Sequence, residues 1–346
     1  MKLFKSLLVA PATLGLLAPM SASANEVTIN DFNAAEEIAV TNSRVDGLEA
    51  RFNDLEAGSF SETTTASFGV DFVIGAEDGA DSEAAAFGYQ MGIGLETSFT
   101  GEDALSATID IGDGTSGALA FDDTTDVLTL DGLTYTFPVG GATVMVGDST
   151  DISAVYTGAC AYSSFTDYMG NCGTGSTVGV GGNGATAAIA YAFDSGFSLA
   201  GGVSSENTGI LTEEGSDLFG IEAAYTADSY GVSVAYSDAE GTTGWGINGM
   251  YAFDFVTLSA GVESVDTGTT AEGFFVGLSF PEVGPGSLDI GMGTTGNFAD
   301  GDTEYYTYEA SYAYPLNDGV TITPGVYIVE GETDVTGVAL KTSFSF

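Results

Sequence analysis

The sequence predicts an all-β fold, a transmembrane antiparallel β-barrel of about sixteen strands preceded by a short coiled-coil helix. Three observations predict it. A secretion signal opens the chain, apolar and polar residues alternate with a period of two from residue 61 to the C-terminus, and short and long connections follow one another in turn. The mature chain has no run of about 18 apolar residues, which argues against membrane-spanning helices.

Residues 1–24 have the three parts of a signal peptide. Lys2 and Lys5 are the positive start, Leu7 to Leu17 is a short apolar stretch, and Ala22-Ser23-Ala24 is a small-residue cleavage site. We therefore expect the mature chain to leave the cytoplasm and to begin at Asn25.

Residues 25–60 are predicted to form a helical segment in the periplasm. Apolar residues recur at the first and fourth positions of a heptad, the pattern of a coiled-coil seam; they are Ile38, Val45, Leu48, Phe52 and Leu55. About three heptads are marginally stable alone, so the helix needs a partner. Self-association is the favoured interpretation, and packing on its own barrel is the alternative.

Residues 61–346 are predicted to be the barrel, because apolar positions face one way and small or polar positions the other. In the first strand Phe68 and Phe72 share the lipid face while Asp71 faces inward. Four tyrosines on one strand (Tyr306, Tyr308, Tyr312, Tyr314) are typical of interfacial aromatic belts. The strands are expected to begin near Glu62, Ala86, Asp103, Val127, Ala142, Gly175, Phe197, Asp217, Tyr230, Thr243, Phe255, Thr269, Gly286, Thr303, Gly319 and Asp334.

The connections distinguish a membrane barrel from a soluble sandwich. Even-numbered connections are short, such as Gly140-Gly141, and odd-numbered ones are often long and acidic, with the longest predicted at 149–174. Outer-membrane barrels have short turns on the periplasmic side and long loops outside. The last strand alternates to a terminal Phe346, which we expect to close the barrel.

The charge is strongly negative and excludes several functions. Five Lys and Arg face 49 Asp and Glu, and the net charge is −44. Such a surface repels nucleic acid. There is no His, which excludes Ser-His-Asp catalysis and His-ligated metal, and we expect no enzyme activity. Acidic loops could hold Ca²⁺ or Mg²⁺ weakly, although solvated loops are the favoured interpretation, and no cofactor or metal site is expected.

The segment that leads into the first strand carries a family resemblance. Asn42-Ser43-Arg44-Val45-Asp46-Gly47-Leu48-Glu49-Ala50-Arg51, then Leu55-Glu56-Ala57 and Phe60-Ser61-Glu62-Thr63-Thr64-Thr65, resembles the outer-membrane porins of cyanobacteria, related to the carbohydrate-selective porin B family. The resemblance implies a trimeric sixteen-stranded barrel in the outer membrane. Members usually begin with an S-layer-homology domain, which is expected to be missing here because only about 15 residues separate the cleavage site from the helix.

Alternation identifies the charges that would line the lumen. Inward carboxylates are predicted at Asp71, Glu96, Asp110, Glu222, Glu263, Asp289 and Glu309, and Lys341 is the one predicted inward cation. Carboxylates in a confined aqueous pore concentrate cations and exclude anions.

The long connection carries a predicted disulfide, Cys160–Cys172, because two cysteines in a secreted chain pair by default. By analogy with general porins, it would fold into the barrel as a constriction, and its expected contributors are Asp151, Asp167, Tyr156, Tyr162, Phe165 and Tyr168. An extracellular loop held by its disulfide is the alternative.

Passive diffusion of small hydrophilic solutes with a preference for cations is the function that these features predict, and the resemblance adds sugars or iron as candidate solutes. A plugged structural or adhesive barrel is the alternative. Sixteen strands enclose a lumen wide enough for water, and the sequence leaves no segment for a plug domain, which favours transport.

Overall fold

The computed structural model describes residues 63–346, except 80–84, 114–118, 120–123, 180–183, 206–216 and 240. The predicted signal peptide and the coiled-coil seam at Ile38, Val45, Leu48, Phe52 and Leu55 lie outside the described residues and stay predictions.

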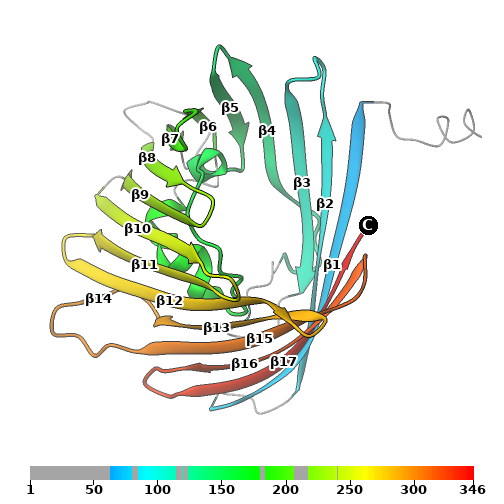
Figure 1. Cartoon of the computed structure of the whole chain (residues 1–346), viewed down its shortest axis with the longest axis vertical. Helices are drawn as coiled ribbons and strands as arrows, with labels where there is room; N and C mark the ends of the chain where they lie inside the picture. The colour runs from blue at the N-terminus through cyan, green and yellow to red at the C-terminus, as the bar shows by residue number, and fades with distance from the viewer. Residues whose placement is uncertain are drawn as a thin grey trace, which may run out of the picture. The chain divides into compact units, whose positions relative to one another are not determined.

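Seventeen strands form one antiparallel sheet in the described part of the chain, and sixteen of them make the barrel wall (Figure 1). The seventeenth, β14, is a two-residue strand beside β12. The strands are β1 Thr64–Asp78, β2 Ala86–Thr97, β3 Ala104–Asp113, β4 Thr129–Val139, β5 Ala142–Asp148, β6 Thr186–Ala192, β7 Phe197–Ser205, β8 Asp217–Thr226, β9 Tyr230–Ala239, β10 Thr242–Ala252, β11 Thr257–Asp266, β12 Thr270–Val283, β13 Gly286–Thr294, β14 Phe298–Ala299, β15 Tyr306–Asn317, β16 Val320–Val329 and β17 Val335–Ser345.

The first and last strands close the barrel. β1 pairs with β17 from Gly69↔Ser345 to Asp78↔Thr336. Phe346 extends this ladder, since its amide donates to the Phe68 carbonyl over 3.0 Å and its carbonyl accepts from the Phe68 amide over 2.8 Å. The two rings stack with centroids 5.7 Å apart. Closure leaves no unpaired edge along this seam, which a barrel in lipid requires.

The wall has an apolar outer face and a small or polar inner face, as the alternation predicts. Large apolar side chains on the outer face are exposed, for example Ile74 at 54% and Ile221 at 56%. Residues opposite each other in an antiparallel ladder share a face, so Asp71↔Gln90 and Gly92↔Asp110 carry the inner face from β1 to β3.

The turns at one end of the barrel are tight. Gly140, whose φ is +63°, sits in the turn between β4 and β5. In the turn before β3, the Asp103 carboxylate accepts from the Tyr135 hydroxyl over 2.7 Å and from the Thr100 amide over 2.8 Å. These hydrogen bonds stabilise the charged form and lower the pKa of Asp103 well below its usual value.

The sixth strand begins later than the sequence predicted. The expected start near Gly175 is wrong, because Gly175–Val178 is a single helical turn, α4, and β6 begins at Thr186. The connection between β5 and β6 is correspondingly longer and also contains the 3-10 helices η2 (Ile152–Val155) and η3 (Asp167–Gly173). Across the described residues, no helix has the length and apolar character needed to cross a membrane.

Candidate functional site: the lumen and the segment inside it

The described part of the connection between β5 and β6, residues 149–179 with 184 and 185, enters the barrel and lies on the inner face of the wall (Figure 1). We call it the inner segment. Its outgoing limb, 152–161, passes from β6 towards β11, its tip, 162–170, reaches β16, and its returning limb, 171–179, runs back to β9.

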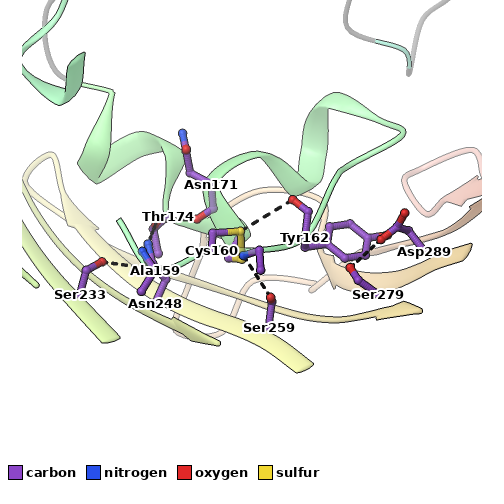
Figure 2. The surroundings of a disulfide bond; sticks show 12 residues. Ala159, Cys160, Tyr162, Asn171, Thr174, Ser233, Asn248, Ser259, Ser279 and Asp289 are labelled. Atoms are coloured by element: carbon purple, nitrogen blue, oxygen red, sulfur yellow. Dashed lines mark hydrogen bonds between the residues drawn. A yellow bond between two sulfur atoms is a disulfide. The ribbon is translucent and has the colours of Figure 1, made fainter. Parts of the chain in front are cut away.

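A disulfide joins the two limbs. Cys160 and Cys172 have Cα atoms 5.7 Å apart, and Cys172 is fully buried against Met169 and Phe275. Figure 2 shows the bond above the β9–β12 wall, with Asn248 and Ser259 beneath it. The tip therefore extends beyond a covalent crosslink whose position is fixed against the wall.

Backbone amides of the outgoing limb donate to side chains of the wall. Thr157 and Gly158 donate to the two oxygens of the Glu222 carboxylate over 2.7 and 2.9 Å. Ala159 donates to Asn248 Oδ1 over 3.0 Å. Since these amides belong to no strand ladder, the wall side chains supply the partners that buried backbone groups require.

The tip is held by Glu309 of β15. Its Oε1 accepts from the Tyr162 hydroxyl and from the Phe165 amide, both over 2.8 Å. Its Oε2 accepts from the Thr166 amide over 2.7 Å and from the Thr166 hydroxyl over 2.6 Å. Burial and the Glu309 charge raise the pKa of Tyr162, so its hydroxyl stays a donor.

The returning limb is held in the same way by Glu263 of β11. Its Oε2 accepts from the Thr177 amide over 3.1 Å, and its Oε1 accepts from Asn297 Nδ2 over 2.8 Å. The Asn248 side chain also donates to the Thr174 hydroxyl over 3.2 Å. Both limbs and the tip are therefore bonded to wall side chains from β8 to β15.

Inward glycines let the segment approach the wall closely. A Cβ at Gly261 would lie 2.0 Å from the Cys172 carbonyl oxygen, and one at Gly325 would lie 2.4 Å from the Phe165 ring. The Phe165 ring fills that space and packs with Val73, Tyr327 and other buried residues in one apolar cluster. Glycine is thus required where the wall and the segment make contact.

The predicted lumen charges fall into two groups. Glu222, Glu263, Asp289 and Glu309 point inward, but they are 2–8% exposed, and three of them bind the inner segment while Asp289 accepts from Ser279 over 2.5 Å. The alternation of apolar and polar residues places these carboxylates on the inner face of the wall, but it carries no information about the segment that covers them. The second group comprises Asp71, Glu96, Asp110 and Lys341, on the inner face of β1, β2, β3 and β17.

The second group is less buried than the first. Glu96 is exposed, and Asp71, Asp110 and Lys341 are half-buried. Asp71 accepts from Gln90 Nε2 over 3.0 Å. The lumen is therefore asymmetric in the described residues, with the inner segment over the wall from β6 to β16 and with less buried inward carboxylates on β1–β3.

The residues expected to form the constriction have different positions. Tyr156, Tyr162 and Phe165 pack against the wall, and Asp151 caps η2 by accepting from the Ser153 amide over 2.7 Å. Asp167 and Tyr168 are exposed on η3. In the described residues, no three His, Cys, Asp or Glu side chains are placed together as metal ligands.

The family model described as Gram-negative porin matches residues 18–334. An uncharacterised protein of Nostoc sp. is 37% identical over 112 residues, which is 31% of this chain and 19% of that protein, so the match spans about a fifth of that relative's length.

Solved porins share the fold. OprB of Pseudomonas putida superposes with a TM-score of 0.67 at 12% identity, covering 82% of this chain and 94% of that one. A mutant of Rh. blastica porin superposes with a TM-score of 0.57 at 16% identity, covering 82% of this chain and all of the other.

Proposed function

Because the chain belongs to the Gram-negative porin family and is an integral outer-membrane barrel, we propose that it is an open diffusion pore. The pore would pass small hydrophilic solutes and favour cations. The observation that carries the proposal is the asymmetric lumen. In the described residues, Asp71, Glu96 and Asp110 of β1–β3 are exposed or half-buried on the inner face, and the exposed charge of the inner segment is Asp167. Lys341 is the only Lys or Arg in the sequence after Arg51.

Fixed negative charges along a narrow aqueous path raise the local concentration of cations and lower that of anions. The exposed Tyr168 on η3 also offers an aromatic surface on which a sugar ring could rest. Sugars and iron are candidate solutes through the resemblance to carbohydrate-selective porins.

A trimer is part of the proposal. β5 and β6 have seven residues each, whereas a strand needs about 9–11 residues to cross the hydrocarbon core. A short wall is better suited to contact with another copy than to contact with lipid. Crosslinking of the folded protein in membranes is expected to give trimers, and a species that remains monomeric would contradict this part.

The test is the conductance of the refolded protein in a planar bilayer under a KCl gradient. We expect stable channels whose reversal potential lies towards that of K⁺, and partial block by added sugars if sugars enter. No conductance from a folded barrel would refute the pore and favour a structural or adhesive barrel. A reversal potential towards that of Cl⁻ would refute the cation preference.

A further inference from the structure

The hydrogen bonds of Glu309 hold the tip of the inner segment against the wall. Its two oxygens accept four hydrogen bonds between 2.6 and 2.8 Å, all from residues 162–166. A carboxylate has about four lone-pair sites, and Glu309 is 4% exposed. It therefore has no site left for a passing ion or solute.

The position of these donors makes Glu309 important for the tip in particular. The disulfide and the bonds to Glu222, Asn248 and Glu263 hold the two limbs. The tip lies beyond all of them, held by Glu309 and by the packing of Tyr162, Phe165 and Met169. A tip released from Glu309 could move without any change in the limbs.

We propose that Glu309 is a positioning residue that fixes the tip of the inner segment and thereby the size limit of the pore, whereas the uncovered Glu96 contributes to its ion preference. The two glutamates face the same lumen, yet Glu309 determines the width of the pore and Glu96 contributes to the charge along it. This inference rests on the proposed diffusion function.

A matched pair of substitutions separates the two roles. Glu309→Gln and Glu96→Gln each remove one charge and keep the side-chain shape. At Glu309 the new amide group would face N–H and O–H donors, so bonds to the tip are lost. Losing one charge-assisted bond, which contributes more than about 1.4 kcal/mol, increases the detached fraction of the tip by at least about tenfold. At Glu96 no tip contact is altered, and only the lumen charge changes.

The experiment measures single channels of both variants and of the wild type, with polyethylene glycols of graded size as neutral probes. Glu309→Gln is expected to admit larger polymers and to show more current fluctuation, with a reversal potential close to that of the wild type. Glu96→Gln is expected to keep the wild-type polymer limit and to reduce the cation preference. Should Glu309→Gln fail to fold, Thr166→Val removes one donor to Glu309 and is expected to widen the limit more modestly.

Two results would overturn the inference. One is that Glu309→Gln and Thr166→Val both exclude polymers of the same size as the wild type does and show no added current fluctuation. The other is that Glu309→Gln shifts the reversal potential as strongly as Glu96→Gln does, while the size of polymer that Glu309→Gln admits stays that of the wild type. A wild-type barrel that does not conduct would instead refute the diffusion function itself, so the two failures are distinguishable.

Discussion

Replacing Gly261 by Ala tests the close contact between the inner segment and the wall. The new Cβ would lie 2.0 Å from the carbonyl oxygen of Cys172 and 3.1 Å from its carbonyl carbon. Carbon and oxygen atoms that are not bonded approach to about 3.3 Å, so the oxygen must retreat by roughly 1 Å. That oxygen cannot move freely, because Cys172 is tied to Cys160 and has a φ of +53°.

The expected cost follows from overpacking, which destabilises by about 1–3 kcal/mol. We expect the Gly261→Ala barrel to lose its heat-resistant gel mobility at a lower temperature than the wild type and to show a changed single-channel conductance. Gly69→Ala is the control, since Gly69 is also an inward strand glycine but has no other atom within 4 Å of the position of its Cβ. A Gly261→Ala barrel as stable and as conductive as the control would refute the contact.

Four further predictions follow from other parts of the molecule. Reducing the Cys160–Cys172 bond should destabilise the inner segment by about 3 kcal/mol on the loop-entropy model, seen as larger current fluctuation; an unchanged trace after verified reduction would contradict this. Lys341→Gln should increase the cation preference in reversal-potential measurements, and a decrease would argue against an inward Lys341. Ile221→Arg on the outer face should cost about 2–4 kcal/mol in refolding titrations if it lies near the bilayer midplane, whereas a neutral effect would place it away from lipid. Because the pKa of Asp103 is lowered in the fold, its contribution to stability is complete above the unfolded value and is lost as the pH falls towards the folded one; Asp103→Asn should therefore weaken the acid dependence of unfolding, and an unchanged dependence would contradict the assignment.

The sequence was sufficient to predict which residues of the barrel wall face lipid and which face inward. Because side chains alternate strictly along a strand, the pattern around Phe72 and Asp71 determines which residues face lipid and which face inward. Antiparallel pairing then carries the same face from strand to strand, so Asp110 and Glu309 both lie on the inner face. The closing contact of Phe346 follows from the same alternation.

The interior could not be predicted to the same extent. A strand was expected to begin near Gly175, because the single helical turn at Gly175–Val178 is too short to show a period of 3.6. In the structure, Thr174 and Thr177 are buried on β9–β11, and the Thr177 amide donates to Glu263. That contact joins residues 86 positions apart, and local patterns carry no information about such pairs.

One signal for the inner segment was present in the sequence. Gly246, Gly261, Gly277 and Gly291 occupy inward positions on four consecutive barrel strands. Glycine in a strand interior often marks the close approach of another backbone. A run of them across neighbouring strands indicates the path of a segment along the wall, although it does not identify which segment lies there.

The most direct test of the whole account is the conductance of a variant in which residues 157–177 are replaced by a short Gly-Ser linker. Barrel folding would be verified first by heat-modifiable gel mobility. Because the inner segment lies over the wall from β6 to β16, its removal is expected to give open channels with a conductance clearly above that of the wild type and a cation preference that persists through Asp71, Glu96 and Asp110. A folded variant with the wild-type conductance would contradict the account, since the segment would then not narrow the pore.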